Sequence, residues 1–259
     1  MDNIMKRKIR SGGSTIGTFI EIGHMNGIEA LENSGLDFVI IDGEHGYADT
    51  ETITDLIRAA ELSGLTPLVR ICEVSRREIQ RVLDSGAQGL VVPGLKNLEE
   101  VKKLVQFAKY APVGNRGFCP TRVSGWGAKD WAQVPMKKYM EIANDNVLVI
   151  PQCETRELLE NIEDVMRTDG VDGTFIGPVD LSISLDVPGE FQHPKLIKAF
   201  DRIRQAAKAS GKILMMYTGG PAQAGALLRQ GYDGVALGLD TAILNSAYRK
   251  LVEEARGVR

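Results

Sequence analysis

Short apolar runs rich in β-branched residues alternate along the chain with amphipathic stretches. Runs of this kind, bounded by glycine and polar residues, predict buried β-strands. We expect eight strands, at residues 16–22, 37–42, 67–71, 89–93, 147–153, 173–177, 213–217 and 234–238. Helical periodicity occupies residues 50–62, 76–83, 98–110, 157–166, 195–209 and 221–228. This alternation predicts an α/β fold with a parallel sheet.

Four of the predicted strands follow the same short pattern, a glycine, an apolar residue and a polar residue. The glycines are Gly35, Gly86, Gly170 and Gly231. A glycine at a helix C-terminus can adopt the left-handed conformation that turns the chain into the next strand. Eight β/α units in 259 residues suit a closed TIM barrel, whereas an open sheet should carry a GxGxxG turn after its first strand. We therefore predict a single (β/α)8 domain over residues 1–259.

The composition narrows the class of protein. With 43% hydrophobic and 25% charged residues, the chain is typical of one large globular domain. Its net charge of -3 is spread over interspersed acids and bases, so we expect neither nucleic acid nor a membrane as a partner. The start is polar, and no run reaches the roughly 18 apolar residues of a membrane helix, which predicts a cytoplasmic protein. Cys72, Cys119 and Cys153 form no CxxC motif and should be free thiols.

The most informative motif follows the second predicted strand and reads Asp42-Gly43-Glu44-His45-Gly46. In a (β/α)8 barrel, catalytic groups lie at the carboxyl ends of the strands. A carboxylate beside an imidazole can fix its tautomer and raise its basicity, as acid/base chemistry near neutral pH requires. Alternatively, Asp42 and Glu44 cap the next helix and His45 is an ordinary polar residue.

Polar residues also stand at the ends of three other predicted strands. They are Arg70, then Gln152 and Glu154, then Asp180 in the run Gly177-Pro178-Val179-Asp180. The carboxylates of Glu154 and Asp180, with no second histidine or thiolate nearby, suit Mg²⁺ or Mn²⁺. Alternatively, Glu154 pairs with Arg70 and Asp180 caps a turn. If Glu154 points into the mouth of the barrel, Cys153 should pack against the helices and be inert, because side chains alternate along a strand.

In order and spacing, these motifs resemble those of the HpcH/HpaI aldolases. The matching segments are residues 42–46, 69–70, 112–117, 152–155, 170–173 and 176–182. The resemblance covers nearly the whole chain and implies a TIM barrel of the phosphoenolpyruvate/pyruvate superfamily. It also implies a class II pyruvate aldolase, acting on compounds such as 4-hydroxy-2-oxoheptanedioate or 2-keto-3-deoxy sugar acids.

The resemblance assigns the main catalytic roles. Glu154 and Asp180 would bind a divalent metal (Mg²⁺, Mn²⁺ or Co²⁺), Arg70 would hold pyruvate and its enolate, and His45 would be the acid/base. The competing aldolase mechanism needs a Schiff-base lysine on a strand. No lysine lies inside the predicted strands, so we disfavour it.

The resemblance also implies supporting roles. Asp84 would raise the basicity of His45, a role that Asp42 could share; alternatively, Asp84 is a polar residue that ends a helix. Gln152 would line the pyruvate site, and the amides of the run Gly177-Pro178-Val179-Asp180 would hold the pyruvate carboxylate.

The chain departs from the family pattern where specificity for the aldehyde is set. Phe19 stands where many relatives have Trp, Tyr47 follows the acid/base motif, and Val179 replaces a common alanine. Glu21 adds a carboxylate near the end of the first strand. This charge would repel an acidic aldehyde and tolerate a neutral, hydroxylated one, unless Glu21 pairs with Arg70 or a lysine.

Two further segments suggest contacts beyond the barrel. Residues 111–131 form a long, glycine-containing stretch, which we interpret as a lid or a subunit contact; alternatively, it is an ordered surface loop. The resemblance implies a homo-oligomer, often a hexamer, in which a C-terminal helix over residues 241–255 packs on a neighbouring subunit.

Two other functions remain open from the sequence. One is another enzyme of the superfamily, such as an oxaloacetate decarboxylase or a carbon-carbon lyase acting on acyl-CoA. A CoA substrate would need a basic patch, and none is obvious. The other is a non-catalytic carboxylate-binding barrel, against which the joint presence of Asp42, His45, Arg70, Glu154 and Asp180 argues.

Overall fold

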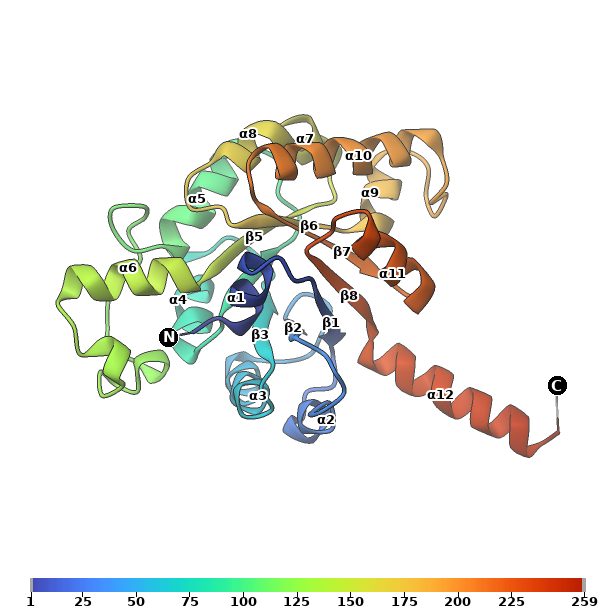
Figure 1. The fold of residues 1–259 in the computed structure, drawn as a ribbon, viewed down its shortest axis with the longest axis horizontal. Helices are drawn as coiled ribbons and strands as arrows, with labels where there is room; N and C mark the ends of the chain where they lie inside the picture. Colours follow the sequence, from blue (N-terminus) through green and yellow to red (C-terminus); the bar gives the residue numbers. More distant parts are fainter. Residues whose placement is uncertain (1, 258–259) are drawn as a thin grey trace.

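Eight parallel strands close into a barrel in sequence order, as predicted. The computed structural model describes residues 2–257 (Figure 1). The strands are β1 Thr15–Ile20, β2 Phe38–Asp42, β3 Thr66–Arg70, β4 Gly89–Val92, β5 Leu148–Cys153, β6 Gly173–Ile176, β7 Ile213–Thr218 and β8 Gly234–Leu239. Each lies within a few residues of its predicted position.

Two hydrophobic clusters fill the two faces of the barrel wall. The inner one contains alternate strand residues such as Ile40, Leu68 and Ile150, and the outer one contains their neighbours, such as Ile41 and Val69. This alternation decides where the later residues of each strand point. Asp42, two residues after Ile40, therefore continues the inner face.

Helices surround the barrel (Figure 1). They are α1 Ile4–Arg10, α2 Met25–Glu29, α3 Thr50–Leu62, α4 Arg76–Ser85, α5 Leu98–Ala108, α6 Met136–Asn146, α7 Arg156–Glu160, α8 Ile162–Arg167, α9 Pro178–Ser184, α10 Pro194–Ala209, α11 Pro221–Arg229 and α12 Asp240–Ala255, with 3-10 turns at Arg122–Ser124 and Asp130–Ala132. Met5 of α1 packs into the inner cluster. Helix α12 extends away from the barrel (Figure 1). Within residues 2–257, no helix has the length and apolar character needed to cross a bilayer.

Local signals explain most helix ends. All four pattern glycines have positive φ, between 85° and 113°. The helix predicted at residues 157–166 is instead two short helices, because the chain leaves helical geometry at Asn161, whose side chain donates to the Glu157 carbonyl. Helices α1, α2, α6 and α9 were not among the predicted elements.

Candidate active site

A cavity of about 230 Å³ opens at the carboxyl ends of the strands. Its wall contains the predicted residues Asp42, His45, Arg70, Gln152, Gly177, Pro178, Val179 and Asp180, together with Phe19, Glu21, Phe175, Tyr217 and Leu239. A larger cavity of about 560 Å³, bordered by α1 and the start of β7, contains none of them. Eight of the predicted site residues, all except Glu154 and Asp84, thus line a cavity at the end of the barrel where (β/α)8 enzymes place their chemistry.

Arg70 is held by two carboxylates, one from the last residue of β2 and one from the loop that follows it. Its Nε and Nη2 donate to Oδ1 and Oδ2 of Asp42 at 2.9 and 2.5 Å, and its Nη1 lies 3.1 Å from Oε2 of Glu44. The two strands are in register at this point, with Asp42 beside Arg70. The guanidinium also lies 4.8 Å above the ring of Phe19. These contacts fix the position and the charge of Arg70.

Asp42 positions other groups and does not touch the imidazole of His45. Its side chain is 1% exposed, and its Oδ1 accepts the backbone N–H groups of Glu44 and His45 at 3.0 and 3.3 Å. Burial alone would raise the pKa of Asp42, but Arg70 and these amides hold the pKa below its usual value. Among residues 2–257, no hydrogen bond or ion pair joins Asp42 to the imidazole, because the carboxylate binds Arg70 and the two amides instead. The predicted role of Asp42 in orienting the imidazole stays a prediction.

Glu44 is the carboxylate that lies beside His45. Its Oε2 is 3.7 Å from Nε2 of His45, and the His45 side chain is 63% exposed at the mouth of the cavity. Burial raises the pKa of Glu44, the charges of Arg70 and His45 lower it, and Asp42 and Asp180 raise it further. In the sequence, Glu44 stands out only as part of a motif. The pairing of Glu44 with Arg70 depends on the turn at Gly43, and the motif alone does not predict the geometry of this turn.

Glu154 presents a buried carboxylate at the end of β5. It is 8% exposed; its Oε1 accepts the Gly94 amide at 2.7 Å, and its Oε2 accepts the side-chain amide of Gln152. Burial raises the pKa of Glu154, Gln152 and Gly94 oppose the shift, and the charges of Asp180 and Glu44 add to it. Glu154 does not pair with Arg70, which was the alternative to a metal ligand.

The donor set around Glu154 fits a hard divalent cation. The buried Oε1 of Gln152 has no hydrogen-bond partner in the described part of the chain, and a Cβ at Gly177 would come within 2.7 Å of Oε2 of Glu154. Three negative charges, those of Glu154, Asp180 and Glu44, lie close enough to disfavour one another. A cation on Glu154 and Asp180 would relieve this repulsion. Residues 2–257 contain no group of three or more His, Cys, Asp or Glu side chains placed to hold a metal.

Helix α9 begins directly at the cavity. Pro178 occupies its first position, and the next two amides, those of Val179 and Asp180, precede the first intrahelical bond, from Leu181 to Gly177. Such N–H groups have no partner within a helix and are available to an anion.

Comparison with known proteins agrees with this geometry. Residues 15–247 match the HpcH/HpaI aldolase/citrate lyase family. The chain belongs to this family. It is 32% identical over 244 residues to a 4-hydroxy-2-oxo-heptane-1,7-dioate aldolase of Salmonella typhimurium, covering 94% of this chain and 91% of the relative. It is also 32% identical over 249 residues to a 2-keto-3-deoxy-L-rhamnonate aldolase of Klebsiella pneumoniae, covering 95% and 91%.

Solved structures show the same relationship. An HpcH/HpaI aldolase from Desulfitobacterium hafniense has a TM-score of 0.91 and 29% identity, over 98% of this chain and 97% of the other. Citrate synthase SbnG has a TM-score of 0.88 and 30% identity, over 99% and 98%. The general activity of this HpcH/HpaI family member is accordingly that of an aldolase or lyase.

In this family member, Asp84 is not brought to His45 within one chain. It lies near the end of α4, where its Oδ1 accepts Nη2 of Arg116 at 2.7 Å. Helices run antiparallel to the strands in such a barrel, so a helix C-terminus and a strand C-terminus lie at opposite ends. The predicted support of His45 by Asp84 is therefore absent from the single chain.

The long segment after α5 also lies away from the cavity. It lies between α5 and α6, in the connection that leads to the start of β5, so it belongs to the amino end of the barrel. None of its described residues lines the cavity. Arg122 in this segment binds Glu61 and the Ser85 carbonyl, and Phe118 packs edge-on to Tyr139. The lid role that we expected is not supported by this placement.

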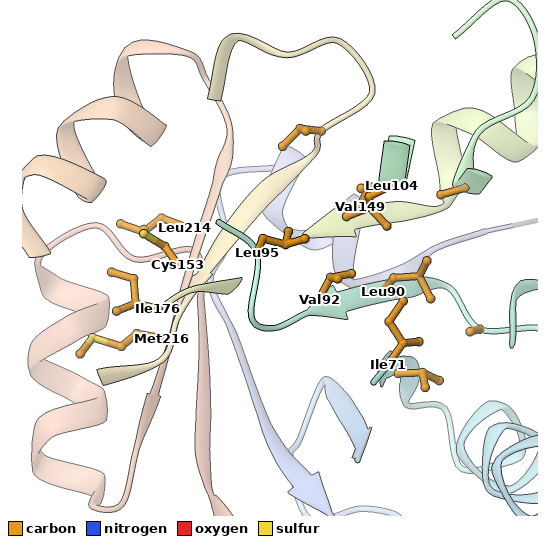
Figure 2. Close-up of a cluster of buried hydrophobic side chains, with 14 of the residues drawn as sticks. Ile71, Leu90, Val92, Leu95, Leu104, Val149, Cys153, Ile176, Leu214 and Met216 are labelled. Carbon is orange, nitrogen blue, oxygen red and sulfur yellow. The ribbon is translucent and has the colours of Figure 1, made fainter. Parts of the chain in front are cut away.

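The three cysteines are free, as predicted, and two are exposed. Cys153 instead packs in the outer cluster beside Ile176 and Leu214 (Figure 2). Burial raises the pKa of its thiol to about 12. This burial follows from the alternation along β5, which turns Gln152 toward the cavity and Cys153 toward the helices.

Proposed function

We propose that this family member is a divalent-metal-dependent aldolase that cleaves or forms 4-hydroxy-2-oxo acids through the enolate of pyruvate. The observation that carries the proposal is the convergence of a buried carboxylate, Glu154, with the unpaired amide oxygen of Gln152, the fixed charge of Arg70 and the exposed imidazole of His45 at one end of the barrel. Each is a residue type that this reaction requires.

Arg70 supplies a preorganised positive charge. A guanidinium has five N–H donors, and Asp42 and Glu44 engage its Nε and one side of each terminal nitrogen. An N–H on each terminal nitrogen is therefore available to the oxygens of a 2-oxo acid. Because Asp42 holds the group rigidly, it needs no reorganisation as charge develops on the enolate.

We assign the proton transfer to His45. In the cleavage direction, its imidazole accepts the C4 hydroxyl proton while the C3–C4 bond breaks. The aldehyde carbonyl forms at C4, and the electron pair of the broken bond passes into the pyruvate enolate, which is then protonated at C3. Glu44, at 3.7 Å, stabilises the imidazolium formed in the first step.

Glu154 and Asp180 are the residues that would hold the divalent metal, with Gln152 beside them. The chemistry that such an ion supplies is Lewis acidity toward the 2-oxo group. The amides of Val179 and Asp180 are available to the pyruvate carboxylate. No lysine lines the described part of the cavity wall, which supports this route over a Schiff base.

The similarity to citrate synthase SbnG favours one second candidate, another carbon-carbon bond-forming or bond-breaking enzyme of the superfamily. Examples, already considered from the sequence, are enzymes acting on an acyl-CoA or on oxaloacetate. The described charged residues of the cavity wall are Glu21, Asp42, Asp180 and Arg70, with His45 at the mouth. This set contains no cluster of cations for the phosphates of CoA. It therefore supports the aldolase over the acyl-CoA enzyme.

A product screen tests the proposal directly. The protein is incubated with pyruvate, Mg²⁺, Mn²⁺ or Co²⁺ and a panel of aldehydes, and products are identified by mass spectrometry. We expect hydroxy-oxo acids that require the metal. Condensation of oxaloacetate with acetyl-CoA, without any product from aldehydes, would favour the second candidate.

We further propose that the protein works in the cytoplasm as a homo-oligomer, such as a hexamer, with α12 packed on a neighbouring copy. No described residue of α12 is buried, and it exposes Ile243, Leu244, Tyr248, Leu251 and Val252 by 43% to 63%. Since Asp84 and His45 lie at opposite ends of one barrel, a pair between them requires two copies. Light scattering of the full chain and of Leu251→Asp tests this: the variant should dissociate, and a monomeric wild-type protein would contradict the proposal.

A further inference from the structure

We infer that Glu21 forms a subsite for a neutral, hydroxylated aldehyde and excludes aldehydes that carry a carboxylate. This inference rests on the proposed function and specifies its second substrate. The two relatives named above share 32% identity with this chain, yet one name specifies a dicarboxylic acid and the other a deoxy sugar acid. Overall similarity does not choose between these classes, so the choice depends on the cavity.

The cavity has two sides of different chemistry. Arg70, Gln152 and the start of α9 lie on β3, β5 and β6, and these are the groups proposed to bind pyruvate. A second wall is formed at the ends of β1, β7 and β8 and contains Glu21, Tyr217 and Leu239. With pyruvate in place, the aldehyde can only extend toward this second wall.

Glu21 carries the only charge on that wall among the described residues. The alternative that Glu21 pairs with Arg70 is wrong, because Arg70 pairs with Asp42 and Glu44. Within residues 2–257 Glu21 forms no ion pair with a lysine or arginine; its Oε2 accepts the Thr241 hydroxyl at 3.0 Å. A neutral hydroxyl fixes the carboxylate and leaves its charge uncompensated.

A second carboxylate strengthens the negative potential at this rim. Asp240 accepts the backbone N–H groups of Glu21 and Ile22 at 3.0 and 2.9 Å. These bonds hold the end of β1 against the start of α12, so the position of Glu21 is set by backbone as well as by Thr241. Two negative charges on one side of a small cavity disfavour a third, that of an acidic substrate.

Glu21 also offers favourable contacts. Its Oε1 accepts no hydrogen bond within the described chain, so a hydroxyl of the aldehyde can donate to it. A hydroxyl donating to a carboxylate forms a charge-assisted bond, which is stronger than one between neutral groups. The same side chain therefore binds a hydroxylated aldehyde and rejects a carboxylated one.

A matched pair of aldehydes tests the inference. Glycolaldehyde and glyoxylate have two carbons each and differ in a hydroxymethyl group against a carboxylate. The kcat/KM of each, with pyruvate as the other substrate, is measured for the wild-type protein and for Glu21→Gln, which keeps an acceptor for Thr241. The ratio of the two values is compared between proteins, so the different intrinsic reactivities of the aldehydes cancel.

We expect Glu21→Gln to shift this ratio toward glyoxylate by about tenfold, equivalent to about 1.4 kcal/mol. Glu32→Gln is the matched control, because it removes the same charge from an exposed position outside the cavity, and it should leave the ratio unchanged. A ratio unchanged within twofold in Glu21→Gln, or an equal shift in the control, overturns the inference.

Exchange of the pyruvate methyl protons with deuterium needs no aldehyde and separates the two levels of the account. If the wild-type protein exchanges these protons but the ratio does not move, the subsite is wrong and the aldolase proposal stands. If the wild-type protein neither exchanges them nor forms aldol products, the proposed function and the subsite inference fail together.

Discussion

Replacing Arg70 with lysine separates a catalytic role from a structural one. The structure gives Arg70 three contacts with carboxylates, at 2.9 and 2.5 Å to Asp42 and 3.1 Å to Glu44. A lysine keeps the charge but cannot form the two parallel bonds to Asp42. At least one charge-assisted hydrogen bond to a buried carboxylate is lost, which we expect to cost about 1.5–3 kcal/mol of stability.

The same change should reduce catalysis in the molecules that remain folded. Removing one preorganised donor from a developing oxyanion costs about 10² to 10³ in rate. We expect Arg70→Lys to lose at least about tenfold in kcat/KM for aldol cleavage, a cautious lower bound on that range. The assay is cleavage of a 4-hydroxy-2-oxo acid under conditions in which urea unfolding shows the variant to be fully native.

Arg122→Lys is the control for this experiment. Arg122 also binds a carboxylate and a carbonyl, those of Glu61 and Ser85, but lies outside the cavity. It should lose stability and keep its kcat/KM. If Arg70→Lys behaves in the same way, with lower stability and a rate within twofold of the wild type, Arg70 only holds the barrel together and the mechanism is wrong.

Three further predictions follow from the site. Glu154→Gln should weaken the binding of Mn²⁺, measured by calorimetry, at least about tenfold. His45→Ala should bind Mn²⁺ as the wild type does, and loss of binding in this variant would show that His45 is a metal ligand. The pKa of Asp42 lies below its usual 3.8, so its negative charge stabilises the fold above that pH. The loss of unfolding free energy in Asp42→Asn, relative to the wild type, should therefore shrink as the pH falls below about 4. A loss that stays constant down to about pH 3 would contradict this. Cys72 and Cys119 should react with a thiol reagent in the native protein at pH 8, and Cys153 only after unfolding; three equally fast thiols would show that β5 is misplaced.

The fold could be predicted from the sequence because each strand contains a short run of apolar residues that is buried in the barrel wall. Such runs are typical of parallel strands that are buried on both faces. The helices that were missed are short or have weak periodicity. Helix α9, for example, has seven residues and begins at Pro178. Helix α1 covers the inner cluster, and Met5 is the one apolar residue of this helix that is fully buried. Tertiary packing stabilises these elements more than their own sequence does.

The candidate site could be predicted as a set of residues but not as a set of contacts. Strand alternation brings Asp42, Arg70 and Gln152 to one cavity. It does not specify which carboxylate binds Arg70, because that depends on the turn at Gly43, where the amide donates to the Arg70 carbonyl. The partner of Asp84 within the chain, Arg116, was not predicted for a different reason, since linear spacing does not show at which end of the barrel a helical residue lies.

The most direct test of the account is the exchange of the pyruvate methyl protons with deuterium, followed by NMR without any aldehyde. It isolates enolate formation from the choice of the second substrate. The account predicts exchange with Mg²⁺ or Mn²⁺, loss of exchange after treatment with EDTA, recovery when the metal is restored, and no exchange in Glu154→Gln. Exchange that survives thorough chelation and is blocked by borohydride in the presence of pyruvate would contradict it and indicate a Schiff-base lysine.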